Sequence, residues 1–214
     1  MKSKLVINEA LDDWAKKNAR IGALMNSEYG ALLRQTYEKL DTTVLYRSRI
    51  HGCGHIERTM LLGAMIAQAL EMSMHESRML LLCCSYHDIG RSNDMYDTEH
   101  GNVAAKKLMT PDMKGKFRGY SAEDFKIIQA AITLHSRRDK EIDNVAKEYG
   151  LAAGSMARYY RVAKCLKDSD NLDRVRLGDL DTRHLRHQES IDMVPDAQWI
   201  FDTYKAKTAK SHAK

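Results

Sequence analysis

The near absence of helix-breaking residues is the feature that most constrains how this chain folds. Only 2 prolines occur among 214 residues, so long helices are permitted throughout the chain. Strict alternation of apolar and polar residues, the pattern of half-buried strands, is almost absent, and β-branched residues are sparse. Apolar residues recur instead at helical spacing, as in the stretch 54–70. We therefore expect an all-α fold, built as a helical bundle.

Length and composition favour one compact domain. A chain of 214 residues is close to the usual size of a single domain. Its 43% hydrophobic and 29% charged residues are typical of a globular protein rather than a disordered one. We divide the chain into an N-terminal helical flank (1–49), a central core (50–178) and a C-terminal helical appendage with a basic tail (179–214).

The charge balance argues against a dedicated nucleic-acid binder. There are 34 basic and 29 acidic side chains, a net charge of +5, and part of the excess lies in the C-terminal sequence KAKTAKSHAK. Nucleic acid is therefore a possible partner but not an indicated one. No stretch approaches the about 18 apolar residues of a membrane span, and the N-terminal apolar run is too short for a signal peptide. We expect a cytoplasmic protein without a membrane partner, and its oligomeric state stays open.

Capping residues indicate where the central helices begin and end. Ser73 and Ser121 each precede an acidic residue by three positions, which is the spacing of an N-terminal cap. Thr98 is expected to cap a helix that runs through Leu108 and ends before Pro111. One or two amphipathic helices, broken near Gly30, are expected over 3–41. The other expected helices are 54–70, 73–88, 121–135 and 155–166, with a looser helical segment over 180–206.

Each central helix carries a side chain that can bind a metal ion on, or at the end of, its apolar stripe. An ionisable group that points into a core must be paired, neutral or metal-bound, because burying it unsatisfied costs several kcal/mol. One shared metal site accounts for these groups better than separate compensations. Imidazoles and carboxylates without thiolates suit Mn²⁺, Fe²⁺, Mg²⁺ or Zn²⁺. The inward-facing residues are His55, His87, His100, His135 and Asp170, with Asp88 beside His87.

The order of these residues resembles the signature of a known family. His55, the doublet His87-Asp88 and then Asp170 are similar to the H…HD…D pattern of the HD-domain superfamily of metal-dependent phosphohydrolases. The contexts HGCGHIERT, YHDIGR and KDSDNLDR also resemble the family's motifs. The resemblance covers residues 50–178 and implies an HD-domain-like helical bundle.

The resemblance also implies a set of metal ligands. His55, His87, Asp88 and Asp170 would bind one ion, while His100 and His135 would bind a second, with Asp88 bridging. Two ions about 3.5–4 Å apart can clamp a phosphoryl group and activate a water molecule for attack on phosphorus. Mn²⁺ or Mg²⁺ is favoured, Fe and Zn are alternatives, and a site with one ion stays open. We prefer Asp170 as the last ligand because it directly precedes a pair that matches the family's x-L, and Asp168 is the alternative.

Basic residues that follow the ligands are candidates for substrate binding, because charge develops on phosphoryl oxygens during transfer. Arg58 lies one turn after His55, and we expect it to act in catalysis together with Asp88. His51 lies four residues before His55 and is a candidate general acid. For each arginine a helix-end salt bridge is the alternative role. The expected substrate-binding residues are Arg58, Arg91, Arg137 and Arg174.

The expected function is metal-dependent hydrolysis of a phosphate ester or anhydride. The resemblance implies a small phosphorylated substrate, such as a nucleotide, attacked by metal-activated water. A few members of the superfamily hold two irons with the same six types of ligand and oxidise small molecules, so a di-iron oxygenase is an alternative. A non-catalytic nucleotide-binding module with a structural metal is the third hypothesis.

Overall fold

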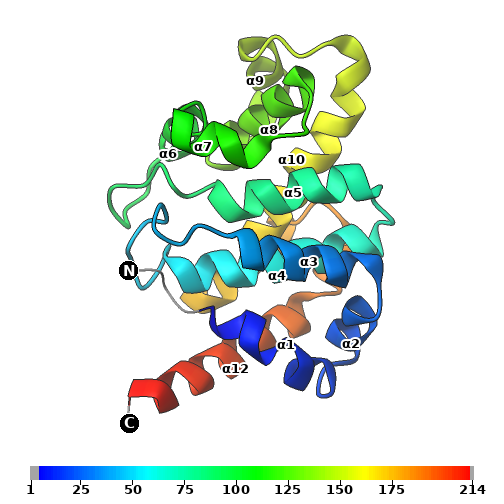
Figure 1. Cartoon of the computed structure of the whole chain (residues 1–214), viewed down its shortest axis with the longest axis vertical. Coiled ribbons are helices and arrows are strands. Elements are labelled where there is room, and N and C mark those ends of the chain that lie inside the picture. The colour runs from blue at the N-terminus through cyan, green and yellow to red at the C-terminus, as the bar shows by residue number, and fades with distance from the viewer. Residues whose placement is uncertain (1–4, 213–214) are drawn as a thin grey trace.

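The computed structural model describes residues 5–212, and it confirms the expected all-α fold (Figure 1). These residues form twelve α-helices and five short 3-10 helices, and no strand is present in this range. The α-helices are α1 (Val6–Ala15), α2 (Ala19–Met25), α3 (Glu28–Lys39), α4 (Cys53–Ala69), α5 (Met74–Tyr86), α6 (His100–Lys107), α7 (Pro111–Lys114), α8 (Ala122–His135), α9 (Ile142–Glu148), α10 (Met156–Leu172), α11 (Gln188–Ile191) and α12 (Val194–His212). The 3-10 helices are η1 (Gly115–Phe117), η2 (Asp139–Glu141), η3 (Ala153–Ser155), η4 (Asp173–Leu177) and η5 (Thr182–His184).

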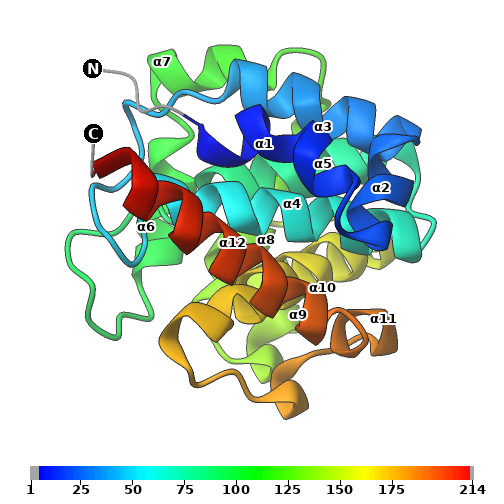
Figure 2. The same cartoon turned by 90° about the horizontal axis from the view of Figure 1, so that it is seen from below.

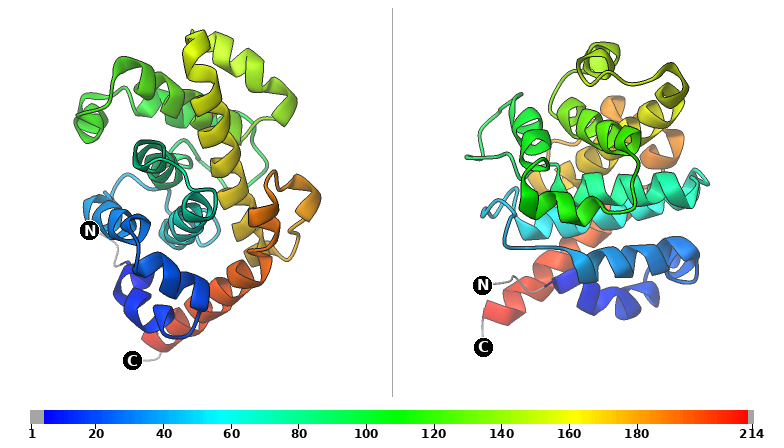
Figure 3. Two further views of the ribbon diagram at one scale, coloured as in Figure 1. Left: turned by 90° about the vertical axis from the view of Figure 1, so that its right-hand side faces the viewer. Right: turned by 45° about the horizontal axis from the view of Figure 1, so that its top comes forward.

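Four helices form the centre of the bundle. Helices α4, α5 and α10 pack against one another, and α8 packs against α5 and α10. In Figure 3 (left), α4 and α5 are seen nearly end-on and α10 runs beside them. Helix α6 packs on α8, while α1–α3 and α12 lie on the other side of α4 (Figures 1 and 2). None of the helices within the described residues combines the length and the apolarity that crossing a membrane requires.

Two of the three caps expected for the central helices are present, and the third is not. Ser73 caps α5, and Ser121 caps α8 through a complete capping box with Asp124. The expectation that Thr98 caps the third central helix is wrong. Helix α6 begins at His100 after Glu99, and the carbonyl of Thr98 accepts a hydrogen bond from Ser136 Oγ at 2.8 Å. This segment is therefore held by α8 rather than by a local cap.

The expected break near Gly30 is also wrong, because Gly30 lies inside α3. The helices of this region are separated at Asn18 and Ser27, whose side chains accept hydrogen bonds from the first turns of α2 and α3. A Cβ at position 30 would collide with the backbone carbonyl of Leu24. Glycine here permits the close approach of α3 to the end of α2, and it does not mark a break.

The C-terminal part of the chain is more helical than expected. Helix α10 does not stop at residue 166 but continues to Leu172, so Asp168 and Asp170 lie on its last turns. The appendage contains α11 and α12, and most of the expected basic tail belongs to α12. Residues 213 and 214 of that tail lie outside the described residues. Viewed from below, α12 runs diagonally across α4 and beside α1 (Figure 2).

The N-terminal flank joins the same hydrophobic core as the central helices. One cluster of buried apolar side chains extends from Ile7 in α1 to Ile200 in α12. Glu57 of α4 is fully buried, and its carboxyl group accepts the backbone N–H groups of Val6 at 3.1 Å and Ile7 at 2.8 Å. Glu57 therefore fixes the start of α1 on α4, and burial raises the pKa of its carboxyl group to about 7.

Replacing Glu57 tests this attachment. Glu57→Gln keeps an oxygen acceptor for the first turn of α1, so we expect the protein to stay folded. Glu57→Ala removes the acceptor and should lower the free energy of unfolding by about 1–3 kcal/mol in chemical denaturation. Because the pKa of Glu57 is raised in the folded state, the wild type should lose stability relative to Glu57→Gln as pH rises from 4.5 through about 7. Equal stabilities of the two substituted proteins would contradict this role.

Candidate metal centre

All six sequence-predicted ligands lie close together, and each is at or near the end of a helix. His55 is in the first turn of α4, and His100 is the first residue of α6. The other four are at carboxyl ends: His87 and Asp88 directly follow α5, His135 is the last residue of α8, and Asp170 is in the last turn of α10. All are buried except Asp170, whose side chain is 28% exposed. The structure therefore brings together all six predicted metal ligands.

One half of the cluster contains His55, His87 and Asp170. The Nε2 atoms of the two histidines are 3.1 Å apart, and Asp170 Oδ1 lies 3.3 Å from His55 Nε2 and 3.8 Å from His87 Nε2. Asp88 Oδ2 approaches the same two nitrogens at 3.5 and 3.7 Å. These separations suit donors that surround one ion.

The other half contains His100 and His135. Their Nε2 atoms are 2.8 Å apart, and Asp88 Oδ1 lies 3.2 Å from the first and 3.6 Å from the second. The carboxylate of Asp88 therefore stands between two pairs of histidines and directs one oxygen to each. Glycine at position 101 permits this packing, because a Cβ there would lie 2.5 Å from the carbonyl oxygen of Ile132 in α8.

Each imidazole is oriented by a hydrogen bond from its Nδ1 atom. His55 Nδ1 lies 2.7 Å from Asp173 Oδ2, and His87 Nδ1 lies 3.0 Å from the carbonyl oxygen of Cys84. The Nδ1 atoms of His100 and His135 contact the carbonyl oxygens of Asp97 and Ile132. A ring that donates through Nδ1 and is otherwise neutral presents a lone pair at Nε2, which is the arrangement of a metal-binding histidine.

The charges of the cluster also fit a bound cation. Burial acts to raise the pKa values of Asp88 and Asp170, but the surrounding imidazoles outweigh burial and hold both values well below the ordinary range. Burial lowers the pKa of His87 to about 3, so this ring is neutral. Burial also opposes the charge on His55, but Asp170 and Asp173 outweigh it and raise the pKa of that ring.

One atom of the cluster lacks a partner. Asp88 Oδ2 is the buried side-chain nitrogen or oxygen atom that has no hydrogen-bond partner among the described residues. A buried anionic oxygen left alone costs several kcal/mol. Together with the lone pairs that face one another across the cluster, this oxygen shows that the donor set can hold a metal ion.

Asp168 and Asp170 have different surroundings, although they are two residues apart. Successive side chains on a helix project about 100° apart, so these two point in nearly opposite directions. Asp170 faces the histidines, whereas Asp168 is fully buried away from them. Asp168 accepts hydrogen bonds from Arg186, His187 and Ser190, and it therefore fastens the 179–193 segment to α10.

Arg58 does not lie where the sequence analysis expects it. We predicted that it contacts the phosphoryl group, but its side chain is buried and pairs with Asp173, with Nε 2.5 Å from Oδ1. Its guanidinium also stacks on the rings of Phe201 and Tyr204 in α12, at 5.5 and 4.9 Å from their centroids. Because α12 covers this face of α4, Arg58 acts through Asp173 on His55 as a positioning residue.

The other predicted substrate-binding and catalytic residues are distributed around the cluster. Arg91 pairs with Asp88 Oδ1 at 2.9 Å. Arg137 pairs with Glu148 and also lines a cavity of about 390 Å³ that reaches His135 and Asp170. His51 precedes α4, and its ring centroid lies 5.9 Å from that of His55. Arg174, in contrast, forms an exposed pair with Asp179 and does not line that cavity.

Sequence reasoning missed two residues of this region. Asp173, which orients His55 and also pairs with Arg58 and Arg176, stands three positions after Asp170, the spacing that puts two side chains on one helix face. Lys167 lines the same cavity, and its buried ammonium group donates to the carbonyl oxygen of Leu134 at 3.1 Å. Its spacing of three from Asp170 could have indicated its place.

Comparisons of this chain with protein-family models, with curated proteins and with solved structures found no match. The resemblance to HD-domain proteins therefore rests on the order of the six ligands and on their convergence in a helical fold, which are compatible with an HD-like arrangement.

Replacing Asp88 tests whether the cluster binds metal. Asp88→Asn keeps the size of the side chain but removes the charge that both histidine pairs face, so we expect the metal content to fall sharply. Elemental analysis of the purified protein measures this. Asp202→Asn, an exposed change on α12, is the matched control and should keep the metal content of the wild type. Equal metal content in both substituted proteins would contradict the assignment.

Replacing Arg58 tests its positioning role. Arg58→Ala leaves the buried carboxylate of Asp173 without its bidentate partner, and we expect the free energy of unfolding to fall by about 3 kcal/mol or more. Arg137→Ala, which breaks a pair with a half-exposed glutamate, should cost less than about 1 kcal/mol. Chemical denaturation of the two proteins gives the comparison. A small change for Arg58→Ala would show that Asp173 does not depend on it.

Proposed function

We propose that this chain is a divalent-metal-dependent phosphohydrolase of the HD type, acting on a nucleotide or a related small phosphate ester or anhydride. The observation that carries the proposal is the position of Asp88, whose two carboxylate oxygens face two separate pairs of histidines. This arrangement suits two ions that share one bridging carboxylate.

The donors divide naturally between two ions. His55, His87 and Asp170 with Asp88 Oδ2 would hold one ion, and His100 and His135 with Asp88 Oδ1 would hold the other. When bound, such ions polarise a phosphoryl oxygen and lower the pKa of a water molecule that attacks phosphorus. Nitrogen and oxygen donors without sulfur suit Mn²⁺, Mg²⁺, Fe or Zn. For a phosphohydrolase we propose Mn²⁺ or Mg²⁺, with Fe or Zn as alternatives.

The cavity beside the cluster supports an anionic substrate. It reaches Asp170 and His135 and has a volume of about 390 Å³, which is enough for a small phosphorylated molecule. Four cations line its wall, and they can contact phosphoryl oxygens. Arg137 also pairs with Glu148, and Arg186 and Lys167 also pair with Asp139, which lines the same cavity, so Arg138 is the cation of this group without a carboxylate partner for its side chain among the described residues. Tyr96, whose side chain is almost fully exposed at the rim, offers a ring on which a nucleobase can stack.

His51 lies near the cluster and can act on the reacting group, whereas Arg91 positions a ligand. Burial lowers the pKa of His51, and its Nδ1 lies 2.9 Å from Asp94, which orients the ring. Only the protonated form of this ring can donate a proton to a leaving group, so the lowered pKa favours that role at acidic pH. Arg91 pairs with Asp88 and keeps the carboxylate in place.

The test combines metal analysis with an activity screen. We expect about two ions per chain in the wild type, and Mn²⁺- or Mg²⁺-dependent release of phosphate from a panel of nucleotides and other phosphate esters. Asp88→Ala should abolish both metal binding and turnover, while Asp202→Ala should change neither. Retained hydrolysis by Asp88→Ala would contradict the proposal.

The same experiment separates the alternatives. Iron that stays bound after aerobic purification, with oxygen consumption and without phosphate release, would replace the hydrolase with a di-iron oxygenase. Absence of metal after reconstitution would leave a non-catalytic binding module. A single ion that is unaffected by His135→Ala would remove His100 and His135 from the site.

A further inference from the structure

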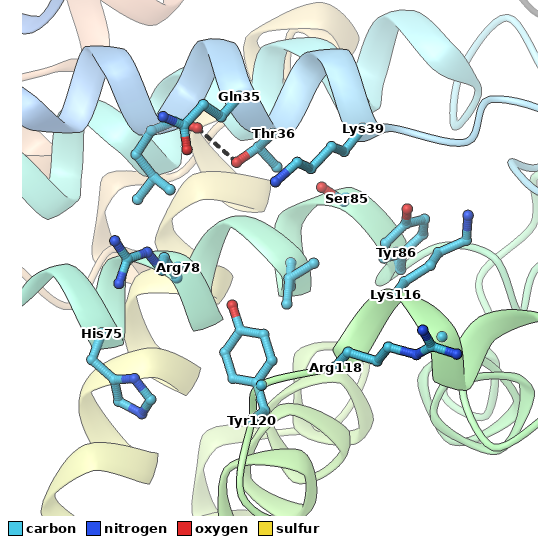
Figure 4. Close-up of a pocket in the computed structure, with 14 residues that line it drawn as sticks. Gln35, Thr36, Lys39, His75, Arg78, Ser85, Tyr86, Lys116, Arg118 and Tyr120 are labelled. Carbon is cyan, nitrogen blue, oxygen red and sulfur yellow. Dashed lines mark hydrogen bonds between the residues drawn. The ribbon is translucent and has the colours of Figure 1, made fainter.

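A second cavity lies apart from the histidine cluster. It is bounded by α3, by α5 and by the segment that leads into α8, and its volume is about 560 Å³ (Figure 4). None of the six candidate metal ligands lines it. Its contents would therefore not share the ligands of the metal centre.

The walls of this cavity are strongly basic. Lys39 comes from α3, Arg78 from α5, and Lys116 and Arg118 from the segment before α8. No acidic side chain lines the cavity within the described residues. The cavity therefore concentrates positive charge from three separate elements in one place.

Three of these cations have no partner for their side chains within the described part of the chain. Lys116 pairs with Asp41 at 3.1 Å. Among residues 5–212, the structure gives Lys39, Arg78 and Arg118 no hydrogen-bond or ion-pair partner. Like charges gathered around a concave surface repel one another, and a bound polyanion relieves that repulsion. Guanidinium groups are suited to phosphate because they offer paired N–H donors.

The cavity also contains apolar and aromatic surface. Leu32 and Leu82 line it from α3 and α5, and the half-buried ring of Tyr120 lies 6.1 Å from the ring of His75. In Figure 4 the hydroxyl group of Tyr120 points into the space between α3 and α5. Burial raises the pKa of Tyr120 to about 12, so its hydroxyl group remains a neutral donor. The site therefore offers an apolar and aromatic surface beside its cations, which suits a ligand that has a ring as well as anionic groups.

We propose that this cavity is a binding site for a nucleotide that carries several phosphate groups. The phosphates contact Arg78, Arg118 and Lys39, and the base packs against Tyr120 and the two leucines. A volume of about 560 Å³ accommodates a ligand of that size. The proposal is independent of the hydrolase function, because the two sites share no residue.

The proposal is tested by calorimetry on the full chain with a non-hydrolysable nucleoside triphosphate analogue and with inorganic tripolyphosphate. Arg78 and Arg118 are exposed, so the double variant Arg78→Ala/Arg118→Ala should fold normally. We expect it to weaken binding of the analogue by about tenfold or more. Lys106→Ala/Lys147→Ala removes the same charge from exposed positions outside the cavity and should leave the affinity unchanged.

A third protein distinguishes the two sites. In Asp88→Asn, binding of the analogue should persist, because the basic cavity does not involve the histidine cluster. Loss of binding in Asp88→Asn with retention in the arginine double variant would overturn the proposal. An equal loss of affinity in the Lys106→Ala/Lys147→Ala control would also overturn the proposal. The same holds if the analogue does not bind to the wild type. Equal affinities for tripolyphosphate and the analogue, or tighter binding of a single-stranded oligonucleotide, would overturn the assignment to a free nucleotide.

Discussion

The buried carboxylate of Asp88 is the constraint on which the rest of this structure depends. An anionic group with a 3% exposed side chain is tolerated only when positive charge or hydrogen-bond donors surround it. Here Arg91 donates to one carboxylate oxygen, and the other oxygen has no hydrogen-bond partner within the described residues. The four imidazoles around the carboxylate supply the further ligand atoms with which it can hold a metal ion. The ends of α4, α5, α6 and α8, which carry these rings, therefore meet at a common point.

Groups outside the cluster orient its four histidine rings. The carbonyl oxygens that accept from His87, His100 and His135 belong to residues only three positions earlier in the chain. The ends of α5 and α8 therefore orient His87 and His135, and the segment before α6 orients His100. His55 differs, because its acceptor Asp173 lies 118 residues away and also binds Arg58. Three of the histidines are thus oriented by nearby residues. The orientation of His55 depends instead on the tertiary packing of α4, η4 and α12.

The sequence predicts the helices of this fold better than it predicts the contacts that individual side chains make. Periodicity and capping spacing predict the central helices, and the inward positions of the six ligands follow from the same periodicity. The environment of Arg58 could not be predicted, because it depends on α12, which the sequence analysis treated only as a loose appendage. The break expected at Gly30 failed for a similar reason: the absence of a side chain serves a close contact between helices, and only the packed structure reveals that contact.

The contact between Arg58 and Tyr204 also affects the order in which parts of the chain can pack during synthesis. His55 and Arg58 leave the ribosome roughly 150 residues before Tyr204 and its helix, a delay on the order of ten seconds. Through that interval the face of α4 that carries Arg58 lacks its aromatic cover. The nascent chain must therefore keep Arg58 without this cover until α12 packs on α4, which makes the covering of the Arg58–Asp173 pair a late step of folding.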